Sequence, residues 1–302
     1  MPFIASLRYR VGQFHRILSR IDAPRDGGRK DSEPRMQHEI EQFLRSLDMP
    51  GQDARNYLEI HMGRIVKTLA MTPPPFRTGQ VLELGAYMHM TPALKCVLGY
   101  DEVRGAYFGP LGRTDKKTAS AGGKVVFECF VDLFDAEKDR YPYQDGRFDC
   151  VLACEIFEHF LHDPMHMLFE SRRVLTDGGS LVLTTPNVAS FTAVARVLES
   201  SGNPQLYSKY ANPKGEFADT EIPHVREYTP QELSEAVQSA GFAIETLVTE
   251  TAPGYHAGGG WVEQFLKDHG YSTDLRGEQM YCVARKVEAA NLSRYPGFLY
   301  DM

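Results

Sequence analysis

The sequence predicts an α/β protein built on a doubly wound, mostly parallel sheet of seven strands. From residue 76 onward, short apolar segments alternate with helical segments, a pattern that places helices on both faces of a parallel sheet. The prolines at 73–75 separate this part from a helical region before it, because a helix cannot continue through three prolines. With 302 residues, of which 42% are hydrophobic and 24% charged, the chain has the length and composition of a protein with a large core.

Residues 1–35 are predicted to form a basic amphipathic helix and a linker. The first 30 residues carry seven Lys or Arg against two Asp, although the whole chain has a net charge of −7. Apolar residues recur every three or four positions through residues 1–21, which places them on one face of a helix. Three interpretations stay open: packing on the same domain or on a second subunit in a homodimer, contact with an anionic membrane surface, and a cleaved transit peptide. The Gly-, Pro- and charge-rich stretch that follows is typical of a linker.

Residues 36–75 are predicted to form a helical cap. One helix is expected from His38 to Leu47, and a second begins near Asp53 and ends before the three prolines. Apolar residues at helical spacing give each of them one face to bury.

The main domain is predicted to span residues 76–287. Its seven strands are apolar runs, and helices are expected between them at 91–98, 164–175 and 231–240. The last helix has an N-cap at Thr229 and a C-cap at Gly241. The expected strands are 81–85, 103–108, 124–131, 148–153, 180–185, 242–248 and 279–285.

Three further segments complete the expected organisation. Segments 188–230 and 249–278 are long connections that carry few strand or helix signals, and 249–278 is a C-terminal insert between the last two strands. The tail 288–302 is rich in aromatic residues, so we expect it to pack on the domain or on a partner.

Composition excludes several classes of protein. No run of about eighteen apolar residues is present, as a spanning helix requires, and no secretory signal is evident. The five cysteines are scattered and odd in number, which favours buried thiols in a reducing compartment over a disulfide framework. The acidic balance disfavours general nucleic-acid binding, which needs a basic face. We therefore expect a soluble cytoplasmic protein, or one that contacts the inner face of a membrane through residues 1–21.

Three segments together carry a family resemblance. Val81-Leu-Glu-Leu-Gly-Ala86, Phe148-Asp-Cys-Val-Leu-Ala-Cys-Glu-Ile-Phe-Glu-His159 and Arg173-Val-Leu-Thr-Asp-Gly-Gly-Ser-Leu-Val-Leu-Thr-Thr-Pro-Asn187 resemble the class I S-adenosylmethionine-dependent methyltransferases. The resemblance covers roughly residues 76–250 and implies a Rossmann-like fold. Within that superfamily, Thr184-Thr-Pro-Asn187 and His224-Val-Arg-Glu-Tyr-Thr-Pro230 look most like methyltransferases associated with glycan and polysaccharide genes.

The resemblance implies S-adenosyl-L-methionine as cofactor and S-adenosyl-L-homocysteine as product. In an open α/β sheet, ligands bind beyond the carboxyl ends of the strands, where Glu83, Gly85 and Ala86 are expected. The Glu83 carboxylate can attract the ammonium of the methionine part, and Gly85 lets the backbone approach the ligand closely. The glycines expected after Gly85 are missing, which disfavours a dinucleotide site.

Other cofactor-binding residues are implied by position. Asp132 matches the acid that accepts a hydrogen bond from the adenine amino group, although an N-cap role is an alternative, and Leu133 is expected to pack on the adenine. Glu155 belongs to the segment beside the methionine part. The ribose acid usual at the end of the second strand is absent, so a hydroxyl of Tyr107 or a carboxylate from Asp115 takes its place in our interpretation.

Methyl transfer to a hydroxyl requires a base, and histidine has the appropriate pKa. The candidate catalytic residues are His159, His224 and Glu158, where Glu158 orients a histidine or pairs with Arg226. Structural roles for either histidine stay open. No tight ligand spacing indicates a metal, so none is predicted, although both histidines with Asp219 and Glu221 form an alternative metal-binding set.

Acceptor binding is assigned to Tyr228, Arg226 and Trp261, with core packing as the alternative for Tyr228 and Trp261. Trp261 follows three glycines and is interpreted as a stacking residue on a lid. The predicted activity is O-methylation of a saccharide or glycolipid hydroxyl. Alternatives are a methyltransferase acting on a small metabolite, a membrane-held lipid or quinol, or a protein side chain, a catalytically inactive binding module of the same fold, and a dinucleotide oxidoreductase.

Overall fold

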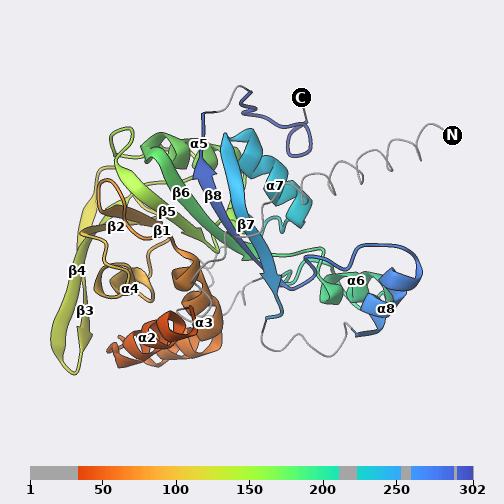
Figure 1. Cartoon of the computed structure of the whole chain (residues 1–302), viewed down its shortest axis with the longest axis horizontal. Coiled ribbons are helices and arrows are strands. Elements are labelled where there is room, and N and C mark those ends of the chain that lie inside the picture. Colours follow the sequence, from red (N-terminus) through yellow and green to blue (C-terminus); the bar gives the residue numbers. More distant parts are fainter. Residues whose placement is uncertain (1–32, 211–222, 253–259, 289–290, 302) are drawn as a thin grey trace.

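A computed structural model describes residues 33–210, 223–252, 260–288 and 291–301. The expected helix at 1–21 lies outside these residues, as do Asp219 and Glu221. The described part is built around one eight-stranded sheet of order β3-β4-β2-β1-β5-β6-β8-β7 (Figure 1). The α/β, Rossmann-like fold with a mostly parallel sheet is therefore confirmed.

The strands β4, β2, β1, β5 and β6 run parallel, whereas β8 pairs antiparallel with both β6 and β7. Chain order reverses at β1, which lies between β2 and β5, and this is where an open sheet forms a crevice for a ligand. The strands are β1 (Gln80–Leu84), β2 (Glu102–Tyr107), β3 (Thr114–Ala121), β4 (Lys124–Leu133), β5 (Phe148–Cys154), β6 (Leu175–Pro186), β7 (Phe242–Glu250) and β8 (Gln279–Lys286).

Helices cover both faces of the sheet, and each face has its own apolar core. Helices α5 (Pro164–Val174) and α7 (Pro230–Ser239) pack on one face, where Leu168 and Val237 are fully buried. Helices α2 (Glu33–Ser46), α3 (Gln52–Met71) and α4 (Thr91–Cys96) cover the other, through residues such as Leu44 and Leu69. In Figure 1, α2 and α3 lie together below the sheet.

The eighth strand, β3, was not expected from the sequence. It forms an antiparallel hairpin with β4 through the two-residue turn Gly122-Gly123, in which both residues have positive φ. Asp48, in the connection between α2 and α3, accepts hydrogen bonds from both glycine N–H groups at 3.2 and 2.8 Å. The cap and the edge hairpin are thereby joined.

Asp149 in β5 anchors the segment that leads from the cap into β1. Its Oδ2 accepts the backbone N–H groups of Phe76, Arg77, Thr78 and Gly79 at 2.9–3.0 Å. Burial opposes ionisation here, but these donors hold the pKa of Asp149 below its ordinary value. One carboxylate therefore fixes the start of the strand that carries Glu83.

The two long connections contain helices that the sequence did not predict. Helix α6 (Phe191–Leu198) packs against α8 (Gly260–Asp268), with Ala195, Val262 and Leu266 buried between them. Figure 1 shows this pair standing away from the sheet, beyond the end of β7. Within the described residues, no helix is both long and apolar enough to cross a membrane.

Candidate active site

A pocket of about 60 Å³ lies where β1, β5 and β6 end and helix α3 crosses them. The loop after β1 contributes Gly85, Tyr87 and His89, and the end of β5 contributes Cys154 and Glu155. Helix α3 closes the pocket with residues that the sequence had not singled out. The complete lining is Tyr57, Arg64, Ile65, Thr68, Glu83, Leu84, Gly85, Tyr87, His89, Met90, Cys154, Glu155 and Thr184.

Glu83 places a buried carboxylate in the wall of this pocket. Its side chain is 4% exposed, and its Oε2 has no hydrogen-bond partner among the described residues. Burial raises the pKa of Glu83 to about 7, because the charged form is poorly solvated there. Gly85 follows with φ +69°, and a Cβ at this position would lie 2.8 Å from Ile156 Cγ2. Glycine is therefore required at this turn.

Arg64 of α3 supplies the opposite charge. Its Nη1 lies 3.0 Å from Oε2 of Glu155, and its Nη2 donates to the Tyr57 hydroxyl at 3.0 Å. Oε1 of Glu155 accepts hydrogen bonds from Thr184 Oγ1 and Gln279 Nε2, both at 2.8 Å. These contacts hold the end of β5 against the cap helix, with φ of Glu155 at +54°. The sequence singled out Glu155 but not its partner.

Two tyrosines lie at the end of β2, where the sequence lacks the usual acid. The Tyr107 hydroxyl donates to the Tyr87 hydroxyl at 2.8 Å, and the rings meet edge to face with centroids 5.0 Å apart. Both side chains are exposed, so the two hydroxyls present polar groups to solvent. Ala86 donates its backbone N–H to the Ala106 carbonyl at 3.0 Å, which fixes the loop between the two strands.

The structure places Asp132 differently from the sequence-based expectation. Strand β4 runs to Leu133, so Asp132 lies within the strand instead of after it. Its oxygens pair with Arg104 at 2.9 Å and accept hydrogen bonds from the hydroxyls of Thr114 at 2.6 Å and Tyr143 at 2.9 Å. These contacts tie β2, β3 and β4 together. Leu133 is buried in the core on the α3 side of the sheet.

The acid that follows β4 is Asp135, which the sequence analysis did not single out. It is half-buried, and its Oδ1 accepts the backbone N–H of Glu137 at 2.9 Å. Glu137 in turn accepts the backbone N–H groups of His162 and Asp163. The loop after β4 is thereby held beside the loop after β5.

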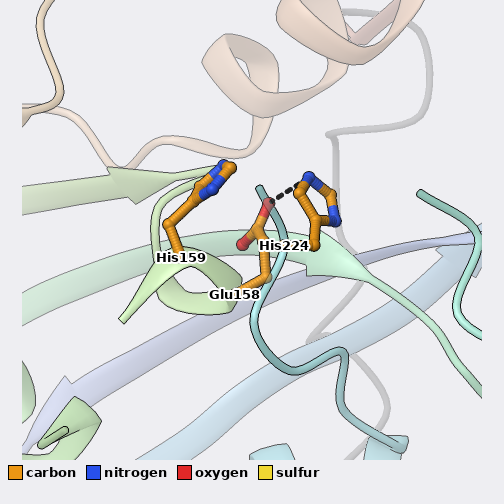
Figure 2. Close-up of side chains that lie close together, drawn as sticks. All are labelled: Glu158, His159 and His224. Atoms are coloured by element: carbon orange, nitrogen blue, oxygen red, sulfur yellow. Dashed lines mark ion pairs between the residues drawn. The ribbon is translucent and has the colours of Figure 1, made fainter. Parts of the chain in front are cut away.

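The three predicted catalytic residues come together after β5. Glu158 and His159 lie in the short 3-10 helix η1 (Phe157–His159), and His224 comes from the segment before α7. One ligand-type atom of each residue lies within 4.8 Å of the corresponding atoms of the other two. Figure 2 shows the Glu158 carboxylate between the two imidazoles. We call Glu158, His159 and His224 the Glu–His cluster.

Glu158 is fully buried. Its Oε2 accepts the Thr185 hydroxyl at 2.9 Å, while its Oε1 has no hydrogen-bond partner among the described residues and lies 3.9 Å from Nε2 of His224. Burial raises the pKa of Glu158 above its ordinary value. Thr184 holds Glu155, which lines the pocket, and Thr185 holds Glu158. The charge of Arg64, which lines the same pocket, favours the ionised form of Glu158, so the cluster lies beside the pocket.

Both histidines are oriented through Nδ1. His159 Nδ1 lies 3.2 Å from the Pro223 carbonyl, and His224 Nδ1 lies 3.1 Å from Oε1 of Glu227. Because each partner is an acceptor, both Nδ1 atoms donate and the lone pair of each neutral ring is on Nε2. Glu227 is itself buried and accepts the backbone N–H groups of Leu206 and Tyr207.

The expected acceptor-binding residues do not join this cluster. Arg226 pairs with Glu232 at 2.6 Å, so the predicted Glu158–Arg226 side-chain pair is wrong. Tyr228 is 1% exposed and packs on Phe157, which makes it a core residue, the alternative that the sequence left open.

Trp261 does not line the pocket. It lies on α8, is 44% exposed, and donates its indole N–H to Glu199 at 2.9 Å. This contact links α8 to the end of α6, so the described geometry makes Trp261 part of that helix pair.

Known proteins were compared with the chain at the level of sequence and fold. A curated relative, an uncharacterized 37.1 kDa protein of a Streptomyces fradiae transposon, is 32% identical over 112 residues. The match covers 37% of this chain and 29% of that protein, so the chain spans about three tenths of its relative's length.

Several solved structures are similar to the chain at low identity. A chain of the complex between the Haloferax volcanii Trm112 methyltransferase activator and its methyltransferase is 15% identical with a TM-score of 0.49, covering 83% of this chain and 98% of that one. A Thermotoga maritima SAM-dependent methyltransferase is 17% identical with a TM-score of 0.45, and the match covers 83% of this chain and 99% of that one. An S-adenosylmethionine-dependent methyltransferase from Mesorhizobium loti is 16% identical with a TM-score of 0.45, and the match covers 73% of this chain and 96% of that one.

The methyltransferase domain family matches residues 57–247, which include most of helix α3, the pocket and the Glu–His cluster. This match covers more than half of the chain and extends over the strands whose ends form the site. The chain therefore belongs to the methyltransferase domain family.

Proposed function

We propose that the protein transfers the methyl group of S-adenosylmethionine to a hydroxyl group of a saccharide or glycolipid. The observation that carries this proposal is the position of the Glu–His cluster beside the pocket, through the neighbouring residues Thr184 and Thr185. A hydroxyl must lose its proton to become a good nucleophile, and the cluster provides two imidazoles and a carboxylate for that step.

The pocket suits the methionine part of the cofactor, which carries one ammonium and one carboxylate. Oε2 of Glu83 is buried without a partner, and an ammonium would satisfy it. The guanidinium of Arg64 lines the same pocket and is the complementary group for the carboxylate. The left-handed turn at Gly85 keeps side-chain atoms away from the ligand.

We assign the remaining parts of the cofactor to the ends of β2 and β4. The paired hydroxyls of Tyr87 and Tyr107 lie where the ribose acid is missing and offer it polar partners. For the adenine amino group, Asp135 replaces the earlier candidate Asp132, because the latter is held inside the strand by Arg104, Thr114 and Tyr143. Leu133 then supports the adenine site from the core.

S-adenosylmethionine supplies an electrophilic methyl carbon on its sulfonium, so the protein contributes alignment and proton removal. His159 is the proposed base, and its contact with Pro223 fixes the tautomer in which Nε2 carries the lone pair. The His224 ring lies against it, and the Glu158 carboxylate lies within 4.8 Å, so the negative charge of Glu158 stabilises the imidazolium that forms after proton transfer.

The saccharide class rests on the short stretches 184–187, 224–230 and 240–242, which look like those of glycan-associated methyltransferases, and the second of them supplies His224 to the cluster. A lipid or quinol acceptor is the second candidate. The observation in its favour is the basic, amphipathic pattern of residues 1–21, which suits an acceptor held at a membrane.

The test is a methyl-transfer assay with S-adenosylmethionine and panels of saccharides, quinols and small hydroxylated metabolites. We expect transfer to a saccharide, and His159→Ala should lower its turnover by about 10²-fold while leaving cofactor affinity nearly unchanged. Methylation of quinols alone would contradict the acceptor class. Loss of cofactor binding in this variant would contradict the assignment of His159 as the base. Cofactor binding without any transfer would indicate an inactive binding module.

A further inference from the structure

We propose that the Glu–His cluster binds one divalent cation of the first transition series, with Zn²⁺ as the representative ion. The ligands are a carboxylate oxygen of Glu158 and one imidazole nitrogen each from His159 and His224, all within 4.8 Å of one another. Two histidines and one carboxylate form a set that suits Zn²⁺ and Fe²⁺ and leaves coordination positions open for another ligand. The sequence left both histidines open as metal ligands, but with Asp219 and Glu221 as the carboxylates instead of Glu158.

The first support is an unsatisfied ligand atom. Oε1 of Glu158 is buried and has no hydrogen-bond partner among the described residues, whereas Oε2 is held by Thr185. An unpaired carboxylate oxygen is costly inside a protein, and a cation would remove that cost. This oxygen lies 3.9 Å from Nε2 of His224. Neighbouring ligands of a tetrahedral zinc ion are about 3.4 Å apart, so these two atoms need to approach by only about 0.5 Å.

The second support is the orientation of the two imidazoles. Histidines that bind metals donate their other ring N–H to a carbonyl or carboxylate, which fixes the ring and the tautomer. His159 makes this contact with the Pro223 carbonyl, and His224 makes it with Glu227. Glu227 is fixed in turn by the backbone N–H groups of Leu206 and Tyr207. In both rings the lone pair is therefore on Nε2, the atom that binds the ion.

Charge gives a third support. Glu158 and Glu227 are 0% and 4% exposed, and they approach opposite nitrogens of His224. Two carboxylates in so small a buried volume favour a bound cation electrostatically. The carboxylate–histidine arrangement also makes the imidazole a stronger ligand.

A cation at this position lies beside the cofactor pocket, where it would lower the pKa of an acceptor hydroxyl. In the zinc-loaded protein the hydroxyl proton would leave to solvent and the imidazoles would act as ligands, whereas in the metal-free protein His159 keeps its proposed role as the base. This catalytic use of the cation rests on the proposed function, whereas the binding itself does not.

The test measures metal binding directly, in a Cys96→Ser background that removes an exposed thiol. Metal-free protein is titrated with Zn²⁺ by calorimetry, and bound zinc is measured after gel filtration. We expect one zinc per chain, and Glu158→Gln and His224→Ala should each weaken binding by at least about tenfold. Glu227→Gln should weaken it by about 10–100-fold without removing a ligand. His269→Ala, at an exposed histidine directly after α8, is the matched control and should bind like the parent.

Co²⁺ provides a readout that does not depend on a variant folding. Visible absorption of Co²⁺ bound to the parent protein should show the bands of a low-coordinate site, and Zn²⁺ should abolish them. An aqueous Co²⁺ spectrum, or zinc binding that is equal in the parent and the Glu158→Gln, His224→Ala double variant, would overturn the proposal.

The two proposals can fail separately. Zinc binding at the cluster without transfer to any acceptor would leave the metal site intact and contradict the proposed activity. Acceptor methylation by chelator-treated protein that binds no zinc would contradict the metal site and leave the activity intact.

Discussion

Arg64 Nη1 lies 3.0 Å from Glu155 Oε2, and this ion pair joins the cap helix α3 to the end of β5. Both side chains line the pocket at the carboxyl edge of the sheet. The pair therefore makes the cap a part of the proposed cofactor site, because it holds a guanidinium in the pocket whose wall carries the Glu83 carboxylate.

Replacing Arg64 should weaken cofactor binding. We expect Arg64→Met to lower the affinity for S-adenosylmethionine by about 10–100-fold, because a charge-assisted contact to the methionine carboxylate contributes roughly 1.5–3 kcal/mol. Calorimetric titration measures the change. Arg45→Met is the control, since Arg45 lies on α2 and pairs with the exposed Glu41 and Glu59. Equal losses in the two variants would contradict the role of Arg64.

Glu83 should make the free protein less stable as the pH rises. Burial raises the pKa of Glu83 from 4.5 to about 7, so between these values the folded state keeps a proton that the unfolded state has lost. The stabilisation is complete below pH 4.5 and is lost as the pH rises through 7. Because Gln does not ionise, Glu83→Gln should gain up to about 3 kcal/mol relative to the parent between pH 4.5 and pH 8. Urea unfolding across this range measures the difference, and a difference independent of pH would refute the assignment.

The two acids near the end of β4 should behave differently. Asp132→Asn should destabilise the fold by about 2 kcal/mol, because it leaves the partly buried Arg104 without its counter-ion. Asp135→Asn should weaken binding of S-adenosylhomocysteine with little effect on unfolding. Thermal unfolding and calorimetry, applied to both variants, separate the roles. If Asp132→Asn weakened ligand binding and Asp135→Asn did not, Asp132 would be the residue that contacts the adenine.

Asp149 should be a stability residue without a direct role in binding. Replacing it by Asn should cost about 2 kcal/mol at neutral pH, since a neutral amide oxygen binds the backbone N–H groups that face Oδ2 more weakly than a carboxylate, and the amide NH2 cannot accept the Thr78 donors that face Oδ1. The pKa of Asp149 is lowered in the folded protein, so its stabilisation is present above pH 3.8 and is lost as the pH falls through the folded pKa. Chemical unfolding at pH 7 and pH 3 measures this, with the exposed Asp145→Asn as control. If Asp149→Asn had the same free energy of unfolding as the parent, Asp149 would not be the anchor of the segment before β1.

The centre of the sheet was predictable because β1, β5, β8 and the second half of β6 are apolar runs buried on both faces. The strand β3 was missed because its sequence, Thr114–Ala121, is polar and lies at an edge, where no periodic apolar face is needed. The signal that was available is Gly122-Gly123, a two-residue pair typical of a hairpin turn. Helix α6 was not predicted either, because the helix that it packs against, α8, is distant in sequence.

The site was predictable where a residue belongs to a strand end and not where it depends on tertiary contacts. Glu83 and Glu155 follow from the order of the strands, and both line the pocket. Arg64 could not be predicted, because a cation on an amphipathic helix is ordinarily solvated, and only the fold brings Glu155 to it. Asp132 was misplaced because the strand extends two residues beyond the expected end, which changes whether an acid lies inside or after it.

Whether the pocket that contains Glu83 binds the cofactor is tested by calorimetry. The purified protein is titrated with S-adenosylmethionine and with S-adenosylhomocysteine, and both titrations are repeated with Glu83→Gln. Both ligands should bind the parent protein with a dissociation constant of about 1–100 μM. Glu83→Gln, which cannot pair with the ammonium, should weaken both by about tenfold or more. Absence of binding at about 1 mM ligand, or equal binding by the parent and the variant, would contradict the placement of the cofactor in this pocket.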